Sequence, residues 1–343
     1  MDTLFRPFVS DRLPAPPTHV AIAIPVRNEA ARLGPLLASL GEAALRSDLP
    51  VKATILANDC RDASAEIARA FAHPRLEVDV VEVAYGDGRP SAGRSRRHAM
   101  DLAASPGGLL MTTDGDAILD PDWISAALRA CRAGADVVCG AIEARYDHVL
   151  ASASGARITR AEAAYCALVH EIRHAIDQVA GRQPVGGALP HYTESGAALA
   201  IRAECYLAAG GLPALFSSED RALVHLAERH GLRIVYAPGM RARVSARLRG
   251  RAVGGMADCL RSRMSDADPL ADQAMLSPDV LRALWQGALR GDVRPYPDRS
   301  EPFGPRLRAS DLERNLIPLR SFVEQTLRPR FDEWKLIYRP ECR

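Results

Sequence analysis

The stretch that decides the fold is GLLMTTDGDAILD, residues 108–120. An apolar run opens it, and two aspartates, Asp114 and Asp116, follow with Gly115 between them. Aspartate disfavours a strand interior, and like charges at this spacing repel each other, so a buried strand is predicted to end here. Two interpretations are open. The residues form either a polar turn that closes the strand or a pair of ligands for a metal ion.

Apolar runs and amphipathic helical segments alternate on both sides of this stretch. The predicted strands are 20–25, 52–58, 76–83, 108–114 and 135–142, and the predicted helices between them are 29–45, 63–72, 92–103 and 121–133. Near-continuous apolar strands separated by helices indicate an α/β fold, with a mostly parallel sheet covered by helices on both faces. Ligands of such sheets bind at the carboxyl ends of the strands, which is where Arg27, Asn58 and Asp114 fall.

The alternation weakens after Ala144. A helix is predicted over 159–179, followed by a loop, a strand over 196–201, a helix ending at His230 and a strand over 232–238. Beyond about Gly250 the pattern is helical, with candidates over 254–265, 277–289 and 309–328. We therefore predict a lead segment over 1–17, an α/β domain over 18–250 and a helical C-terminal extension over 251–343.

The composition is that of a soluble globular protein: 343 residues, 48% hydrophobic, 25% charged, with a formal net charge of +2. No window approaches the roughly 18 consecutive apolar residues of a transmembrane helix. The N-terminus carries charges and prolines where a signal peptide has its apolar core. Seven scattered cysteines without a C-x-x-C pair indicate a reducing compartment. A cytoplasmic protein is predicted, while peripheral membrane contact and the oligomeric state stay open.

Arginine greatly outnumbers lysine, which hints at phosphorylated ligands, although a GC-rich genome produces the same bias. The cluster GRSRRH at 93–98 opens a predicted helix, where backbone N–H groups and Arg94 would meet an anionic ligand. Arg96 and Arg97 fit a solvated basic face equally well. A second basic cluster, SARLRGR at 245–251, lacks the interleaved aromatic residues typical of nucleic-acid binding, so no nucleic-acid partner is predicted.

A second acidic pair, Glu219 and Asp220, stands in SSED at 217–220, where a helix is predicted to begin. Acidic residues suit the positive end of a helix dipole, and Ser217 or Ser218 is a candidate N-cap. Helix capping therefore accounts for the motif by itself. The alternative is that Asp220 is a general base, which must lie within hydrogen-bond reach of the proton that it removes.

The segment HEIRH, from His170 to His174, matches the H-E-x-x-H pattern of zinc hydrolases. At about 100° per residue both histidines fall opposite the apolar stripe of their helix, which suits a metal pair and a solvated surface equally. Ala180 stands where the longer form of the pattern has a third histidine, although Glu194 is conceivable as a third ligand. A zinc-dependent hydrolase is therefore the alternative function from a different enzyme class.

Six segments, taken in chain order, resemble the inverting family 2 glycosyltransferases with the GT-A fold. They are IPVRNEA (24–30), LANDCRDAS (56–64), AGRSRRHAM (92–100), TTDGDAILDPDW (112–123), SGAALAIRAE with AAGGL (195–212) and SSEDRALVHLAERHGLRIVYAP (217–238). The resemblance covers roughly residues 18–250. It implies transfer of a sugar from a UDP or GDP donor to an acceptor hydroxyl, the acceptor being a small molecule, a lipid-linked group or a glycan.

On the donor side, the resemblance assigns the nucleotide pocket to the ends of the first two strands. Pro25, Arg27 and Glu29 would line it, with Glu29 near the ribose. Asn58 and Asp59 stand where the family usually has Asp-Asp-Gly-Ser, and Asp59 would contact the base. This departure leaves the choice between UDP and GDP open.

The resemblance also implies the groups that act on the diphosphate. Arg94 would approach it, and Asp114 would contact the ribose or the metal. Gly115 lets the backbone turn tightly and come close to a ligand. Asp116 would be the principal ligand of a Mg²⁺ or Mn²⁺ ion. Many GT-A enzymes add a downstream histidine, but none follows His230 here.

On the acceptor side, Asp220, with Glu219 beside it, would deprotonate the hydroxyl as it attacks the anomeric carbon. Attack from the face opposite the nucleotide inverts the anomeric configuration. His191, Glu194 and Ser195 are candidate acceptor contacts. The Q-x-x-R-W signature of processive synthases is absent, so a non-processive enzyme is expected. A non-catalytic nucleotide-sugar-binding protein is the remaining alternative.

Overall fold

The computed structural model describes residues 15–86, 91–216, 218–250, 255–292 and 304–337, which fall into two compact units. The first unit contains the chain up to Arg145 and from Tyr192 to Asp258, and the second contains 146–191 and 259–343. The expected boundary near residue 250 differs from this division, because the segment 146–191 belongs to the unit of the C-terminal helices. Most of the lead segment, residues 1–14, lies outside the described residues.

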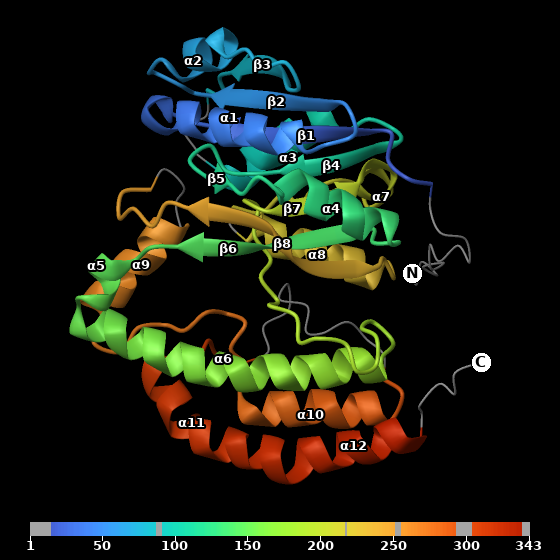
Figure 1. The fold of residues 1–343 in the computed structure, drawn as a ribbon. Coiled ribbons are helices and arrows are strands. Elements are labelled where there is room, and N and C mark those ends of the chain that lie inside the picture. The colour runs from blue at the N-terminus through green and yellow to red at the C-terminus, as the bar shows by residue number, and fades with distance from the viewer. Residues whose placement is uncertain (1–14, 87–90, 217, 251–254, 293–303, 338–343) are drawn as a thin grey trace. The chain divides into compact units, whose positions relative to one another are not determined.

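The first unit is built on an eight-stranded sheet with the order β3-β2-β1-β4-β7-β6-β8-β5 (Figure 1). Strands β3, β2, β1 and β4 are parallel to one another, as are β6 and β8, whereas β7 runs antiparallel between β4 and β6. The sheet is therefore mostly parallel, as predicted. The strands are β1 (His19–Val26), β2 (Val51–Asn58), β3 (Glu77–Val83), β4 (Gly108–Thr112), β5 (Ile118–Leu119), β6 (Val137–Ala144), β7 (Leu199–Arg202) and β8 (Ile234–Val244).

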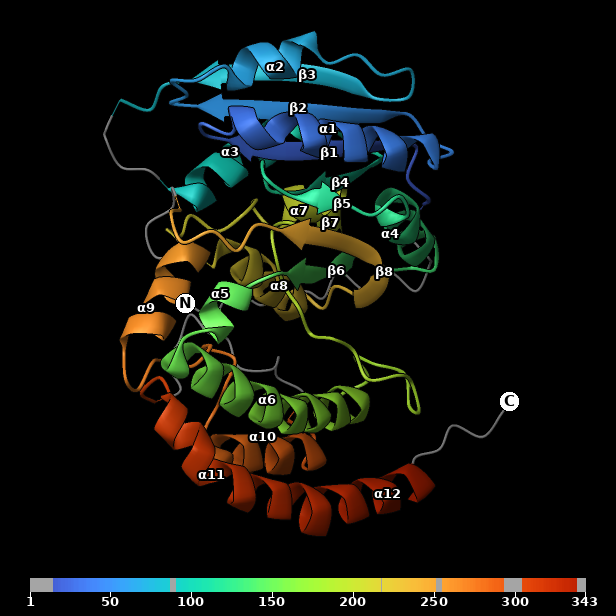
Figure 2. The ribbon, with the colours of Figure 1, turned by 60° about the vertical axis from the view of Figure 1, so that its left-hand side comes forward.

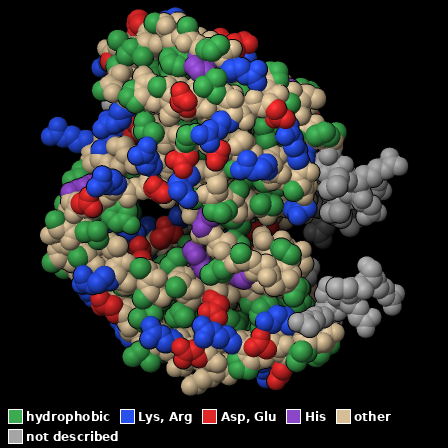
Figure 3. Space-filling model, viewed as in Figure 1, with side chains coloured by type: hydrophobic (Ala, Val, Ile, Leu, Met, Phe, Trp, Pro, Cys, Tyr) green, Lys and Arg blue, Asp and Glu red, His purple; other side chains and the backbone are tan. Residues whose placement is uncertain are grey.

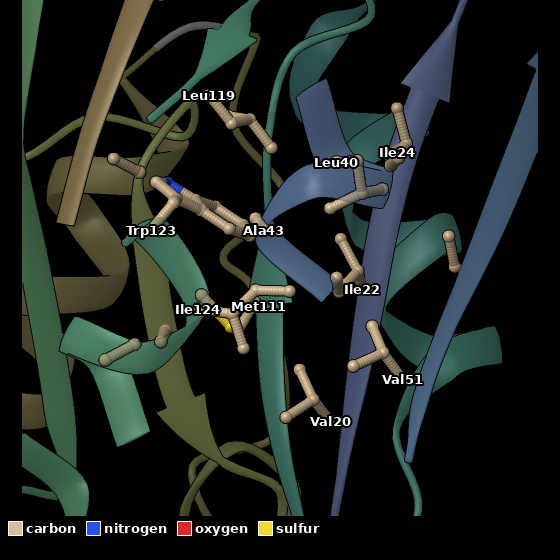
Figure 4. Packing of buried hydrophobic residues seen from close by; sticks show 14 of the residues in the cluster. Val20, Ile22, Ile24, Leu40, Ala43, Val51, Met111, Leu119, Trp123 and Ile124 are labelled. Atoms are coloured by element: carbon tan, nitrogen blue, oxygen red, sulfur yellow. The ribbon is translucent and has the colours of Figure 1, made fainter. Parts of the chain in front are cut away.

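Helices cover both faces of this sheet because alternate residues of each strand point to opposite sides. On β1, Ile22 and Ile24 pack in the same cluster as residues of α1 and α4 (Figure 4), while Ala23 packs in the cluster that includes residues of α3, α7 and α8. The helices of this unit are α1 (Ala30–Leu45), α2 (Ser64–Ala70), α3 (Ala92–Ala103), α4 (Trp123–Arg132), α7 (Ala203–Ala208) and α8 (Glu219–Arg229). The predicted elements are present, with shifted ends.

Truncation of Leu40 tests this packing. Leu40 on α1 is completely buried, whereas Leu45 at the end of the same helix is 50% exposed. Leu40→Ala is expected to lower the free energy of unfolding by about 2–5 kcal/mol, because it removes buried methyl groups and leaves a cavity. Leu45→Ala is the matched control and is expected to cost well under 1 kcal/mol. Urea unfolding followed by tryptophan fluorescence measures both, and equal costs would contradict the assigned core.

The second unit is helical, with α6 (Ala153–Val179) packed against α10 (Pro278–Leu289) and α11 (Ala309–Phe322) (Figure 2). The predicted apolar stripe of α6, Leu168 and Ile172 among it, is buried in this core together with Trp285. Helix α11 continues through a π-helical turn (Val323–Leu327) into α12 (Arg328–Ile337), beyond the predicted end at 328. The short helix α5 (Asp147–Leu150) precedes α6, and α9 (Met256–Ser265) runs across the division between the units.

The surface carries charges of both signs. Acidic and basic side chains are interspersed on the face shown in Figure 3. Within the described ranges, no helix is long and apolar enough to cross a membrane. The described cysteines are free thiols.

Candidate active site

The loops after β1, β2 and β3 are tied together at the carboxyl edge of the sheet. Asn28 and Asp59 have φ values of 53° and 48°, in the left-handed region that Asn and Asp tolerate. The Asn28 side-chain oxygen accepts the Arg61 N–H at 2.7 Å, and the Asp59 carboxylate accepts the Tyr85 N–H at 3.1 Å. Asn58, the last residue of β2, is buried. Asp59, the residue predicted to contact the base, therefore lies in a turn that is fixed by hydrogen bonds to the neighbouring loops.

The N-terminus of α1 is fixed by residues from the loop after β2. The Glu29 N–H donates to Ser64 Oγ at 2.8 Å, and the Ala30 N–H donates to Asp62 Oδ2 at 3.0 Å. These contacts satisfy two of the backbone donors that a helix start leaves open. The segment from Pro25 to Glu29 is thus held at the strand ends, where the nucleotide pocket is predicted.

Gly115 allows the loop after β4 to lie on the end of β1. A Cβ atom at this position would sit 3.2 Å from the Pro25 carbonyl oxygen and 3.4 Å from Glu29 Cγ. Such contacts are tighter than ordinary van der Waals packing. The glycine thus lets this loop come close to the end of β1 and to Glu29, and its close approach to a ligand stays a prediction. As a result Asp114 and Asp116 stand beside the predicted nucleotide pocket.

Arg96 of α3 connects this loop to the second acidic motif. Its guanidinium donates to Asp114 Oδ1 at 2.5 Å, Glu219 Oε1 at 3.0 Å, Thr112 Oγ1 at 3.0 Å and the Gly196 carbonyl at 3.0 Å. The residue is only 5% exposed. Burial opposes its charge, but the carboxylates of Asp114 and Glu219 hold the pKa of Arg96 above its ordinary value. Arg96 is therefore a buried cation, and the solvated face that we left open for it is wrong.

A signal for Arg96 was present in the sequence. Gly93, Arg96, Met100 and Ala103 follow helical spacing, and all are buried in α3. An arginine on the apolar stripe of a helix needs a buried acidic partner. The partners, however, come from positions 18 and 123 residues away, which no local pattern reveals.

Asp220 lies at the start of α8, beside the Arg96 cluster. Its Oδ2 accepts the Gly196 N–H at 2.8 Å, while the Gly196 carbonyl accepts from Arg96. The neighbouring Glu219 is buried in its ion pair with Arg96, and burial raises the pKa of Glu219 although Arg96 opposes the shift. Ser218 is at the N-cap position with φ 62°, and its side chain makes no capping bond. The Ser218 side chain therefore does not cap α8, and the other candidate, Ser217, lies outside the described residues.

A second cation, Arg247, faces the metal-ligand candidate. Its guanidinium donates to both oxygens of Glu29, at 2.9 and 2.5 Å, and lies 3.4 Å from Asp116 Oδ2. Burial raises the pKa of Asp116 to about 6, with help from the charges of Asp114 and Glu29 and against the effect of Arg247. Carboxylates gathered in this way favour a bound cation. Sequence reasoning noticed the basic cluster at 245–251 but gave Arg247 no role.

The raised pKa of Asp116 predicts a pH dependence. An acid whose pKa rises from 3.8 to about 6 on folding binds its proton more tightly in the native state, so stability falls as the pH rises from about 4 to 6. Asp116→Asn removes this linkage. Relative to the wild type, the variant is expected to gain up to about 3 kcal/mol of stability between pH 4 and 7.5.

Urea unfolding in EDTA at both pH values measures this difference. Asp122→Asn is the control, since the Asp122 side chain is 54% exposed in a surface ion pair with Arg46. Its difference from the wild type is expected to change little with pH. An Asp116→Asn difference that stays constant between pH 4 and 7.5 would contradict the assigned environment.

Arg94 lies in the first turn of α3 and contacts Tyr85. Its guanidinium carbon stands 3.8 Å from the centre of the Tyr85 ring, a cation–π contact, and the Tyr85 hydroxyl lies 3.3 Å from His98 Nδ1. Arg97 donates to the carbonyls of Leu212 and Gly210, so it fastens a loop. Residues 87–90, between Tyr85 and α3, lie outside the described residues. The diphosphate role of Arg94 stays a prediction.

The three acceptor candidates fall on both sides of the division between the units. Glu194 is buried, accepts the Tyr236 hydroxyl at 3.0 Å and lies 3.9 Å from His225 Nε2. Ser195 opens the turn that leads into β7, where its Oγ accepts the Ala197 N–H at 3.3 Å. His191 belongs to the second unit, whereas Glu194 and Ser195 belong to the first. Their contact with an acceptor stays a prediction.

The HEIRH residues have partners within the second unit. His170 Nε2 lies 3.1 Å from Cys166 Sγ, and His174 Nε2 lies 3.1 Å from the Gly187 carbonyl oxygen. Glu171 accepts two bonds from Arg328, at 2.6 and 3.0 Å. In the described part of the chain, no three His, Cys, Asp or Glu side chains are grouped to hold a metal. These side chains thus make polar contacts and an ion pair within the second unit, which gives the zinc alternative no support.

The comparisons with known proteins point to one family. The family model described as glycosyl transferase family 2 matches residues 21–195, just over half of the chain. Among solved structures, the TarS 1–349 protein of S. aureus in complex with UDP is 14% identical, with a TM-score of 0.46, and the match covers 66% of this chain. This chain spans 60% of that protein's length. No curated protein matches.

Two further solved structures are similar at this level. The mannosyltransferase PcManGT of Pyrobaculum calidifontis, in complex with GDP-Man and Mn²⁺, is 16% identical, with 95% of this chain and 89% of that one covered and a TM-score of 0.48. Glucosyl-3-phosphoglycerate synthase of Mycobacterium tuberculosis, with Mn²⁺, UDP-Glc and phosphoglyceric acid, is 19% identical, with 72% and 78% covered and a TM-score of 0.44. Likenesses this distant decide nothing about substrates.

The match to the family model begins in β1 and ends at Ser195. It therefore contains the predicted nucleotide pocket, Arg96 and the Asp-Gly-Asp loop, and it is carried by a mostly parallel sheet with helices on both faces. By its motifs, its sheet and this match, the chain belongs to glycosyl transferase family 2 and has the GT-A fold.

Proposed function

We propose that the protein transfers a sugar from a nucleotide-diphosphate donor, UDP- or GDP-linked, to an acceptor hydroxyl with inversion at the anomeric carbon. The observation that carries this proposal is the Arg96 bridge. One buried guanidinium binds Asp114 of the loop after β4 and Glu219, next to Asp220, at the start of α8. A donor-binding carboxylate and a candidate base are thereby held by one rigid connection, as a displacement reaction requires.

On the donor side, the nucleotide is proposed to lie along the ends of β1 and β2. Asp59 contacts the base and Glu29 the ribose, and the turn at Asn28 keeps the backbone fixed. Pro25 and Arg27 line the same edge. Arg94 approaches the diphosphate from the first turn of α3. Ser91 caps the N-terminus of this helix, where its Oγ accepts the Arg94 N–H at 3.2 Å. A helix N-terminus favours such an anion.

The residues present fit a divalent cation. Asp114 and Asp116 supply carboxylate oxygens, the ligand type that Mg²⁺ and Mn²⁺ prefer. Burial, together with the negative charges of Asp114 and Glu29, raises the pKa of Asp116, so a cation bound beside it would stabilise its ionised form. Asp116 would be the principal ligand. When bound, the ion neutralises charge on the leaving diphosphate.

Asp220 is proposed to be the general base that accepts the proton of the acceptor hydroxyl. The acceptor oxygen forms a bond to the anomeric carbon, the bond from that carbon to the diphosphate oxygen breaks, and the hydroxyl proton passes to a carboxylate oxygen of Asp220. The Gly196 N–H, 2.8 Å from Oδ2, fixes the side chain, and Arg96 fixes Gly196. Glu219 keeps Arg96 in place. Transfer of a single sugar is proposed, with Glu194, Ser195 and His191 left as candidate acceptor contacts.

Calorimetry tests the donor assignment. We expect UDP or GDP to bind more tightly with Mn²⁺ than without it, and Asp116→Ala to abolish the metal-dependent part. Asp122→Ala is the control, because it also removes an aspartate near this loop but one that is exposed. A screen of nucleotide sugars for thermal stabilisation then identifies the donor, since a bound ligand raises the melting temperature. Metal-dependent binding that survives in Asp116→Ala would overturn the assignment.

A further inference from the structure

Arg247 places a fixed cation between two carboxylates that the proposed function gives to the donor and the metal. It follows β8, which ends at Val244. Both arms of its guanidinium bind Glu29, and one arm also faces Asp116 at 3.4 Å. A planar two-pronged contact of this kind is specific to arginine.

Arg247 supplies a counter-charge to the buried carboxylate of Glu29. Glu29 is 7% exposed, and a buried carboxylate without a partner is costly. The Arg247 side chain is 21% exposed, so it supplies the compensating charge from the solvent side. Asp116, with 14% of its side chain exposed, shares the same cation. A divalent ion that binds Asp116 is therefore repelled by the positive charge of Arg247, which already lies beside this carboxylate.

We propose that Arg247 is an internal counter-cation that makes metal binding depend on the donor diphosphate, an inference that rests on the proposed function. Without a donor, Arg247 neutralises Glu29 and competes with the metal at Asp116. A diphosphate offers the guanidinium phosphate oxygens at equal or better geometry and adds the negative charge that the metal needs. The arm of Arg247 that faces Asp116 turns toward the diphosphate while the other arm stays on Glu29, and Asp116 becomes available to the ion.

This exchange is a coupling between two ligands and must be reciprocal. If the nucleotide raises the affinity for the metal by some factor, the metal raises the affinity for the nucleotide by the same factor. Arg247 contributes to that factor in two ways. It weakens binding of the metal alone, and it strengthens the nucleotide in the ternary complex. Removing its charge is expected to change the two affinities in opposite directions.

Calorimetry with Mn²⁺ alone, and with UDP or GDP at saturating Mn²⁺, separates these effects. Arg247→Gln is expected to bind Mn²⁺ alone about tenfold more tightly than the wild type, and the nucleotide at saturating Mn²⁺ about tenfold more weakly. Arg247→Lys keeps the charge and is expected to bind Mn²⁺ alone as weakly as the wild type. Arg249→Gln is the matched control, since it removes the same charge from an exposed position two residues away.

The outcomes distinguish this inference from the proposed function. If the wild type shows no metal-dependent nucleotide binding, the proposed function fails. If the wild type shows it and Arg247→Gln binds Mn²⁺ alone no more tightly than Arg249→Gln does, Arg247 is not the counter-cation. Circular dichroism of each variant establishes that it is folded. If Arg247→Gln unfolds, Arg247→Lys is tested in its place. A higher affinity of Arg247→Lys than of the wild type for Mn²⁺ alone would also overturn the inference.

Discussion

Asp220→Asn is expected to lower the turnover of the donor by about 10²–10⁴, the usual contribution of a general base. The asparagine side-chain oxygen still accepts the Gly196 N–H, which Asp220 Oδ2 accepts at 2.8 Å. The variant loses the ability to take up a proton and the bond in which Asp220 Oδ1 accepts the Arg221 N–H at 2.8 Å. Release of UDP or GDP from the stabilising donor, with water as the acceptor, provides the assay.

The affinity for the nucleotide separates catalysis from binding in this experiment. It is expected to be the same in Asp220→Asn as in the wild type, because the donor contacts are proposed at the ends of β1, β2 and β4. Asp101→Asn is a control in a different ion pair on α3, 3.6 Å from Arg97, and is expected to keep normal turnover. Unchanged nucleotide release in Asp220→Asn would remove its role as base.

Arg96→Met is expected to destabilise the first unit by about 3–5 kcal/mol, because it leaves carboxylates buried without their cation. Glu219 has only 6% of its side chain exposed, and Asp114 loses a bond of 2.5 Å. The loss is expected to be smaller at pH 5 than at pH 8, since burial raises the pKa of Glu219 and protonation removes its unpaired charge. Urea unfolding at both pH values measures this.

Two companion variants make the result specific. Arg97→Met removes the neighbouring cation, whose hydrogen bonds go to the carbonyls of Leu212 and Gly210 and whose ion pair with Asp101 is exposed. It is expected to cost about 1–2 kcal/mol with little pH dependence. Arg96→Lys keeps the charge but not the planar fork that serves four acceptors, so it is expected to fall between the two. Equal losses in Arg96→Met and Arg97→Met would show that Arg96 is not the connection between the acidic motifs.

Local sequence determines most of the elements of this fold. The strand at 20–25 and the helices at 92–103 and 277–289 are predicted nearly to the residue, because a strand covered on both faces is a near-continuous apolar run and a half-buried helix repeats about every 3.6 residues. The carboxyl edge of the sheet follows from the same alternation, which is why the Asp-Gly-Asp loop, Asn58 and Glu29 were assigned to one edge. The direction of β7, antiparallel between β4 and β6, was not predictable, since a short apolar run has the same residue pattern in a parallel and in an antiparallel strand.

The division into units followed from packing rather than from pattern. Helix α6 precedes β7 and β8 in the chain, so the sequence placed it in the α/β domain. Its apolar stripe, however, packs in one core with Trp285 and Leu312 of the C-terminal helices. An amphipathic stripe shows that a helix is buried on one side, but not against which segment.

The sequence by itself determined that two acidic motifs, around Asp116 and Asp220, lie just after a strand and at the start of a helix. Only the tertiary structure decided which charges neutralise them. Arg96 and Arg247 looked like two of many surface arginines, and each binds carboxylates more than ten residues away in the chain. Periodicity records where a backbone is buried, whereas an ion pair depends on a few ångströms between distant side chains, and that distance exists only once the sheet has assembled.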